Sequence, residues 1–165
     1  NTHFLKKRRG VIDDVLNKKA SLSSNKIKGN FGEIRAAYHF ETAIHLLDGK
    51  LGLIKRVSVD VVESLDQPIR KGIDAVYEFS SPPPKYIINE VKYGTADLKW
   101  NVDKTIKQMD SKWIDKNLRE AVNKKTYALM MLEKEIPSVL SKVSKEGKIE
   151  QTLLDKYGSK KGKWI

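Results

Sequence analysis

The sequence predicts a single α/β domain with a mixed central β-sheet flanked by helices. Three observations predict this fold class: a helical hydrophobic pattern over residues 31–48, two β-rich runs at residues 73–79 and 85–93 joined by prolines, and a continuous apolar run at residues 126–132. In chain order the predicted elements are a helix, a strand, a two-stranded hairpin, a helix and a strand, which is an αβββαβ arrangement. A length of 165 residues suits one domain and leaves little room for a second.

The chain is strongly basic, and the positive charge is concentrated towards its two ends. The formal net charge is +11. Residues 1–30 hold eight basic and two acidic side chains, residues 31–100 hold nine and ten, and residues 101–165 hold fifteen and nine. A near-neutral middle between basic ends is expected of a protein that holds a polyanion across an acidic centre, and solubility alone is the other interpretation.

Several classes of protein are excluded by what the sequence lacks. There is no cysteine, so disulfides, cysteine-ligated zinc and thiol catalysis are excluded. No apolar run approaches the ~20 residues of a membrane span, and neither a signal peptide nor a Gly-rich phosphate loop is recognisable. His39 and His45 are six apart on one predicted helix, on different faces, so they cannot jointly bind zinc. Because the chain begins with Asn1 rather than Met, we expect it to be part of a longer protein.

Residues 1–29 are predicted to form a basic N-terminal arm or helix ahead of the core of the domain, which we place at residues 30–132. The arm contains the basic run Lys6-Lys7-Arg8-Arg9, and residues 11–20 predict a short helix. Contact with nucleic-acid phosphates and a solvated terminus are both open interpretations of the basic run.

The first core helix is predicted over residues 31–48, with Asn30 as its N-cap and Gly49 as its end. Following the apolar ridge backwards in steps of three and four leads to Glu33, through Leu47, Ile44, Phe40 and Ala37. An acid therefore heads the buried face of the helix. It either borders a metal site or is a helix N-terminal carboxylate favoured by the helix dipole.

Residues 51–62 predict one or two strands, and the hairpin that follows brings charged side chains together. If the turn is centred on Pro82, Asp74 pairs opposite Glu90, and Lys92 projects from the same face as Glu90. Two close carboxylates repel each other and favour a hard divalent cation such as Mg²⁺ or Mn²⁺ between them. The neighbouring ammonium group can orient or deprotonate a metal-bound water, which is the chemistry of phosphodiester hydrolysis.

The second half of the chain predicts a helix over residues 102–123, a buried central strand over residues 126–132 and a helix over residues 133–145 with Pro137 in its first turn. Met109, Trp113 and Ile114 are interpreted as core residues because apolar side chains at helical spacing are usually buried. The tail from Lys156 onwards mixes lysine, glycine and one tryptophan, and it either contacts nucleic acid or extends into solvent.

Asp74 followed by Glu90-Val91-Lys92 resembles the PD-(D/E)xK motif of the restriction-endonuclease-like nucleases, although Ile73 stands where that family usually has proline. The segment from Lys107 to Ile114, with its Lys-Gln-Met and Trp-Ile pairs, is similar to the nuclease domains of bacterial polymorphic toxins, in particular the PoNe branch. The resemblance covers about residues 32–114, and the two blocks together are more specific than either alone.

The resemblance implies a restriction-endonuclease-like core and a metal-dependent endonuclease that acts on DNA. The residues that it implies as catalytic are Asp74, Glu90, Lys92, Glu33 and Gln108; the metal ligands are Asp74, Glu90, the Val91 carbonyl and Glu33. The metal is expected to be Mg²⁺, with Mn²⁺ and Zn²⁺ as alternatives. Nucleic acid would contact Arg70, Lys71, Lys107 and Lys112, and for each of these a solvated or structural role is the competing interpretation.

The resemblance further implies the effector domain of an antibacterial toxin. Such a domain is secreted or surface-delivered within a larger protein, acts in the target-cell cytoplasm and is inhibited by a cognate immunity protein. Two alternatives remain open from the sequence: a nuclease with the same site that cleaves tRNA, and a basic nucleic-acid-binding module without catalysis, in which Asp74 and Glu90 are only strand-end charges.

Overall fold

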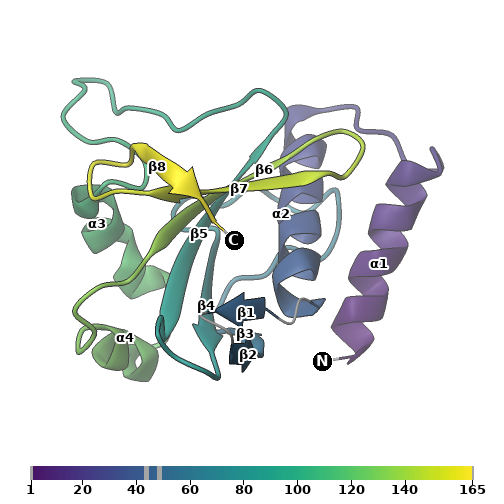
Figure 1. Cartoon of the computed structure of the whole chain (residues 1–165). Helices are drawn as coiled ribbons and strands as arrows, with labels where there is room; N and C mark the ends of the chain where they lie inside the picture. The colour runs from purple at the N-terminus through teal and green to yellow at the C-terminus, as the bar shows by residue number, and fades with distance from the viewer. Residues whose placement is uncertain (1, 43–44, 48–49, 165) are drawn as a thin grey trace.

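The fold is a six-stranded mixed β-sheet with helices on both faces (Figure 1). The computed structural model describes residues 2–42, 45–47 and 50–164. Over these residues the helices are α1 (Thr2–Leu16), α2 (Asn25–Thr42), α3 (Ser111–Ala121) and α4 (Lys124–Met130). The sheet strands are β3 (Ile54–Arg56), β4 (Ala75–Phe79), β5 (Tyr86–Tyr93), β6 (Ser138–Val143), β7 (Ile149–Leu154) and β8 (Lys160–Lys163), while β1 (His45–Leu47) and β2 (Lys50–Gly52) pair separately.

The sheet order is β3-β4-β5-β6-β7-β8, and every neighbouring pair is antiparallel except β5 and β6, which are parallel. The parallel pair requires a long connection, which contains α3 and α4. The predicted class, an α/β fold with a mixed sheet flanked by helices, is therefore confirmed. None of the described helices is both long enough and apolar enough to cross a membrane.

Two apolar layers hold the helices against the sheet. On one face α3 and α4 contribute Leu118 and Met130 to a core that includes Val76, Ile88 and Met109. On the other face α2 packs on the sheet through aromatic and aliphatic side chains, and α1 covers α2 from outside (Figure 1). The prediction that Met109, Trp113 and Ile114 are core residues is confirmed, with Met109 fully buried and the other two partly buried.

The hairpin register follows the prediction. Ala75 pairs with Asn89 and Val76 with Ile88, so the same register extended by one residue sets Asp74 opposite Glu90. The connection through Pro82, Pro83 and Pro84 cannot continue the ladder because proline has no backbone N–H. The paired ends of β4 and β5 therefore bring the two predicted acids together.

The prediction of a central strand at residues 126–132 is wrong, because this segment forms most of the short helix α4 and the turn that follows it. The side chain of Asn123 caps α4 by accepting a hydrogen bond from the Thr126 N–H at 2.8 Å. The hydrophobic pattern of this apolar run does not distinguish a strand from a helix, and here the capping residue and tertiary packing stabilise a helix.

The strand that lies beside β5 is instead β6, where a helix over residues 133–145 was predicted. Pro137 comes directly before β6 rather than in the first turn of a helix, and its carbonyl accepts a hydrogen bond from the Ile88 N–H at 3.0 Å. Val139 and Leu140 are both nearly fully buried, so this strand, like other strands covered on both faces, is apolar without alternation.

The predicted boundaries of the helices need correction. Helix α2 begins at Asn25, so Asn30 is not a cap; it is buried inside the helix and donates hydrogen bonds to the carbonyls of Leu65 and Gln67 at 2.8 and 2.7 Å. The described helix ends at Thr42, and the predicted end at Gly49 lies outside the described residues. The helix predicted over residues 102–123 is limited to α3.

Both ends of the chain form more helix or strand than the sequence predicted. The basic N-terminal segment is the helix α1, which starts at Thr2 and ends at Leu16, rather than the helix predicted over residues 11–20. The C-terminal segment forms the edge strand β8 on β7. His45 belongs to β1 and not to the helix that contains His39, so the predicted placement of both on one helix is wrong.

Candidate functional site

Asp74 and Glu90 meet at the ends of β4 and β5 and form the centre of the candidate site. Asp74 Oδ2 accepts a hydrogen bond from the Val91 N–H at 2.8 Å, which fixes the Asp74 carboxyl group against β5. Glu90 is only 3% exposed. The two carboxyl groups interact directly, and this contact lowers the pKa of Asp74 and raises the pKa of Glu90. The antiparallel register and the side-chain alternation of the strands produce this pairing.

Burial makes both acids hard to ionise, and the charge of Asp74 adds to this effect at Glu90. Burial raises the pKa of the Asp74 carboxyl, with partial compensation from its hydrogen bonds to Glu90 and to the Val91 amide. The pKa of Glu90 is raised well above its ordinary range by burial first and by the charge of Asp74 second. Two desolvated carboxylates at one point favour either a shared proton or a bound cation.

Glu33 on α2 is the third acid of the cluster. Its pKa is raised from 4.5 to about 8, first by burial and then by the charge of Asp74. Helix α2 lies close to β5 at this point because Gly32 has no side chain; a Cβ there would lie 3.2 Å from Val91 Cγ1. The structure therefore brings the three predicted acids into one region.

A small cavity of about 10 Å³ lies between α2 and the sheet, and Glu33, Asp74 and Asn89 are among its lining residues. Asn89 is fully buried, and its Oδ1 accepts a hydrogen bond from Ser141 Oγ at 2.7 Å. Ser141 Oγ in turn accepts from Gln151 Nε2 at 3.0 Å, which fixes the direction of the chain of hydrogen bonds. Asn89 Nδ2 has no hydrogen-bond partner among the described residues. Sequence reasoning missed this amide, although a lone polar residue within Tyr-Ile-Ile-Asn was a visible signal.

Lys92 and Gln108 both face the buried carboxyl group of Glu90. Lys92 Nζ lies 3.9 Å from Glu90 Oε2, and Gln108 Nε2 donates to the same oxygen at 3.3 Å. Lys92 also lowers the pKa of both acids through its charge. The structure thus joins Gln108 to Glu90, whereas the family resemblance implied that it would hold the lysine or a phosphate.

Glu90 has an oxygen atom that could serve as a ligand to a divalent cation. Glu90 Oε1 is buried and receives no hydrogen bond from the described residues, so one ligand oxygen is available. Within the described ranges no three His, Cys, Asp or Glu side chains are arranged as a ready-made metal cage. Mg²⁺ commonly binds through one or two carboxylates and completes its shell with water, which two acids and a backbone carbonyl can accommodate.

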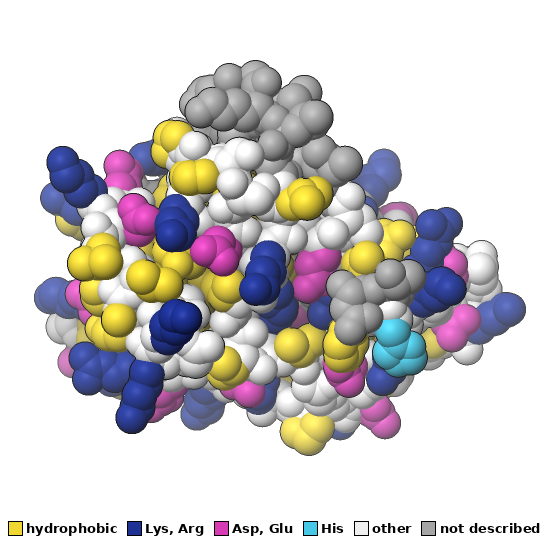
Figure 2. Space-filling view, turned by 90° about the horizontal axis from the view of Figure 1, so that it is seen from below, with side chains coloured by type: hydrophobic (Ala, Val, Ile, Leu, Met, Phe, Trp, Pro, Cys, Tyr) yellow, Lys and Arg dark blue, Asp and Glu magenta, His cyan; other side chains and the backbone are white. Residues whose placement is uncertain are grey.

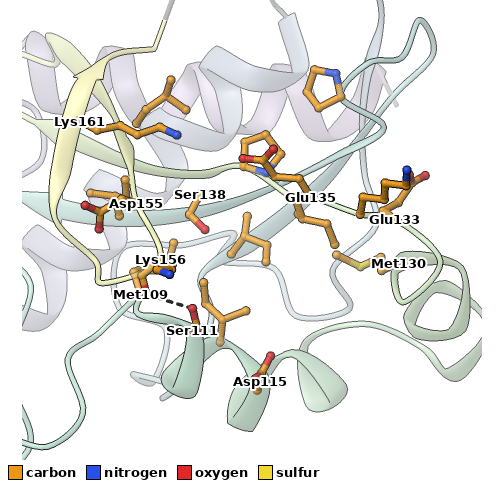
Figure 3. Close-up of a pocket in the computed structure, with 18 of the residues that line it drawn as sticks. Met109, Ser111, Asp115, Met130, Glu133, Glu135, Ser138, Asp155, Lys156 and Lys161 are labelled. Carbon is orange, nitrogen blue, oxygen red and sulfur yellow. Dashed lines mark hydrogen bonds between the residues drawn. The ribbon is translucent and has the colours of Figure 1, made fainter.

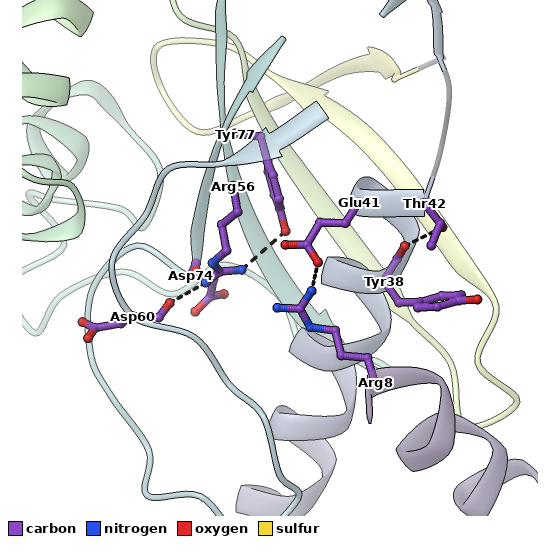
Figure 4. A network of polar contacts seen from close by, with 8 residues as sticks. All are labelled: Arg8, Tyr38, Glu41, Thr42, Arg56, Asp60, Asp74 and Tyr77. Atoms are coloured by element: carbon purple, nitrogen blue, oxygen red, sulfur yellow. Dashed lines mark hydrogen bonds and ion pairs between the residues drawn. The ribbon is translucent and has the colours of Figure 1, made fainter. Parts of the chain in front are cut away.

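Arg56 lies next to the acids and was not predicted as a site residue (Figure 4). It donates to the backbone carbonyls of Asp60 and Asp74 at 2.5 and 3.0 Å, and its guanidinium lies 5.9 Å from the centre of the Tyr77 ring. The charges of Arg56 and Arg70 both lower the pKa of Glu33. Nothing in the sequence around Arg56 indicated this position.

The same figure shows how the N-terminal helix is attached near the site. Arg8 on α1 is buried and pairs with Glu41 on α2 (Figure 4). Burial lowers the pKa of Arg8, and Glu63 counteracts this effect as one of the nearby anionic groups. This part of the basic arm is therefore structural.

The four predicted nucleic-acid contacts differ in their surroundings. Arg70 Nη1 pairs with Asp60 Oδ2 at 2.6 Å, and Lys107 Nζ donates to the Gly158 carbonyl at 2.9 Å. Lys71 and Lys112 are exposed on the surface. The two exposed lysines have their charges directed to solvent, while the other two have protein partners.

A larger groove of about 950 Å³ lies between α3, α4 and the strands β6 to β8, and none of the predicted site acids is among its lining residues (Figure 3). Met109 and Met130 contribute apolar surface, and the labelled charged residues are Asp115, Glu133, Glu135, Asp155, Lys156 and Lys161. Its charges are mixed, and neither Asp74 nor Glu90 lines it, so the chemistry of the buried acid pair identifies the candidate site rather than the size of the groove.

Comparison with protein-family models, with curated proteins and with solved structures finds no match to this chain.

Proposed function

We propose that this chain is a metal-dependent endonuclease of the PD-(D/E)xK type that hydrolyses DNA phosphodiester bonds. One observation supports the proposal most strongly: Asp74 and Glu90 are paired and desolvated at the end of a β-hairpin, with Lys92 beside them. A buried acid pair next to an ammonium group is expected of a site that binds a cation and acts on an anionic substrate.

The order of the elements also supports a restriction-endonuclease-like core. After helix α2 and the separate β1–β2 pair, the main sheet begins with the antiparallel strands β3, β4 and β5. Helices α3 and α4 follow, and then β6 lies parallel to β5. This is the αβββαβ order that the resemblance implies. It is reached with β6 as the last strand in place of residues 126–132.

The chain's own residues have distinct proposed roles. Asp74, Glu90 and the Val91 carbonyl would hold Mg²⁺, with Glu33 assisting directly or through water. The bound cation would lower the pKa of a water ligand and stabilise charge on the phosphate. Lys92 would orient or deprotonate the attacking water, and Gln108 holds the Glu90 carboxyl group in place through its hydrogen bond. The buried surroundings strengthen each of these electrostatic interactions.

The biological setting that we propose is the effector domain of an antibacterial polymorphic toxin. Within a longer secreted or surface-delivered protein, the domain would act in the cytoplasm of the target cell. A net charge of +11 suits both a polyanionic substrate and an acidic immunity protein.

The test is incubation of the purified chain with plasmid DNA and with total tRNA, each in Mg²⁺ and in EDTA. We expect Mg²⁺-dependent loss of DNA. Cleavage of tRNA alone would assign the site to an RNase, and binding without cleavage of either would leave a nucleic-acid-binding module.

Variants connect that activity with the site. Glu90→Gln and Lys92→Ala should each lower the cleavage rate by at least about 100-fold, because each removes a group used in the reaction. Lys145→Ala, which removes an exposed lysine in the turn between β6 and β7, is the matched control and should cleave normally. Full activity of either site variant would show that the catalytic assignment is wrong.

A further inference from the structure

Figure 1 shows the connection between β5 and α3 as a loop, and within it residues 99–108 pair as a short hairpin, which we call the ribbon. Asn101 N–H donates to the Ile106 carbonyl and Gln108 N–H to the Lys99 carbonyl, both at 2.8 Å, and Trp100 bridges to Lys107 in antiparallel fashion.

The tip of the ribbon is stabilised by its own side chains. Lys104 N–H donates to the Asn101 carbonyl at 3.0 Å, and the Thr105 N–H donates to Asn101 Oδ1 at 2.9 Å. Asp103 accepts from the Thr105 hydroxyl at 2.6 Å. The ribbon is thus a defined hairpin rather than an irregular loop.

The ribbon exposes apolar and basic side chains together. Trp100 is 54% exposed and Val102 is completely exposed, although large apolar side chains of this kind usually pack against other groups. Lys99 and Lys104 on the same ribbon are also exposed. An apolar pair flanked by lysines is complementary to a surface that combines apolar groups with phosphates.

The base of the ribbon is attached to the candidate site by one side chain. Gln108 Oε1 accepts from the Lys99 N–H at 2.9 Å, while Gln108 Nε2 donates to Glu90 Oε2 at 3.3 Å. The ammonium group of Lys107 donates to the Gly158 carbonyl and holds the base from the other side. A polyanion bound over Glu90 therefore lies next to the base of the ribbon.

We infer that the ribbon enters the major groove of a DNA duplex, with Trp100 and Val102 contacting base edges and Lys99 and Lys104 contacting phosphates. This inference rests on the proposed nuclease function and selects duplex DNA as its substrate. The major groove of B-form DNA is wide enough for a two-stranded ribbon, and its thymine methyl groups offer apolar contacts. The major groove of an A-form RNA helix is deep and too narrow for side chains to read.

The test measures binding in a non-cleaving background, so that it does not depend on activity. Fluorescence anisotropy of Glu90→Gln with a short labelled DNA duplex, in Ca²⁺, gives the reference affinity. Adding Trp100→Ala should weaken binding about tenfold. Adding Lys104→Ala should reduce the slope of log affinity against log salt by about one. Leu132→Ala, at an apolar residue that is 80% exposed beyond α4, is the matched control and should bind as the reference does.

The groove is identified with modified substrates. A duplex with bulky groups on C5 of its pyrimidines, which fill the major groove, should bind more weakly than the plain duplex, and the difference should vanish with Trp100→Ala. An RNA duplex of the same sequence should show no dependence on Trp100. Unchanged DNA affinity of Trp100→Ala, or a loss confined to tRNA, would overturn the inference. Absence of cleavage by the unmodified chain would instead count against the proposed function.

Discussion

At the residue scale, the raised pKa values of Glu33, Asp74 and Glu90 indicate that this region is formed at a cost to stability. Each acid loses hydration on folding, and the charge of Asp74 further raises the pKa of both Glu33 and Glu90. Arg56, Arg70 and Lys92 offset part of that repulsion. A cluster of carboxyl groups whose ionisation is unfavourable in the folded protein is typical of a site that binds a cation.

The metal-free protein should lose stability as the pH rises from about 4.5 to about 8. Glu33 has an unfolded pKa of 4.5 and a folded pKa of about 8, so in this window the folded state binds more protons than the unfolded state. The free energy of unfolding then falls with pH, by at most about 1.4 kcal/mol per pH unit for one proton. Urea unfolding in EDTA across this range measures the slope.

Glu33→Gln is the variant that isolates this effect, because an amide does not titrate. Its free energy of unfolding should depend less steeply on pH between about 5 and 8 than that of the unmodified chain, by up to the same ~1.4 kcal/mol per unit. Identical slopes for the two proteins would mean that Glu33 is not desolvated as the structure has it.

At the scale of elements, the hairpin could be predicted and the connection after it could not. The register of β4 and β5 follows from side-chain alternation and from prolines that stop the ladder, both of which are local. The identities of α4 and β6 depend on which segment lies beside β5, which is a tertiary choice that an apolar run does not record. Because the hairpin register is local, Asp74 and Glu90 could be predicted as a pair. Asn89 was missed although its place in an apolar run was a signal, and Arg56, which packing across the sheet places beside the acids, had no such signal.

Two glycines of α2 test whether close packing on β5 positions Glu33. Gly29 is exposed, and a Cβ added there would meet no atom within 4 Å, so Gly29→Ala should stabilise the protein by about 0.5–1 kcal/mol through helix propensity. Gly32→Ala should not share this gain, because its new methyl group would crowd Val91. Thermal unfolding of both variants measures the difference, and an equal gain at the two positions would argue against tight packing there.

At the scale of the whole molecule, the basic charge is spread rather than gathered into one block. Residues 1–30 and 101–165 supply all of the excess, yet Arg8 and Lys107 have structural partners. On the face seen in Figure 2, basic, acidic and hydrophobic side chains are interspersed. The net positive charge thus indicates an anionic partner without locating its binding site. Asp74, Glu90 and the ribbon indicate where that partner would bind.

The most direct measurement of the central claim is an anomalous-difference map from crystals of the protein soaked in Mn²⁺. A peak bonded to the carboxylates of Asp74 and Glu90, and absent from crystals of Glu90→Gln, is the predicted result. Crystals of the unmodified chain with no peak at these two carboxylates, or with Mn²⁺ bound only elsewhere, would contradict it.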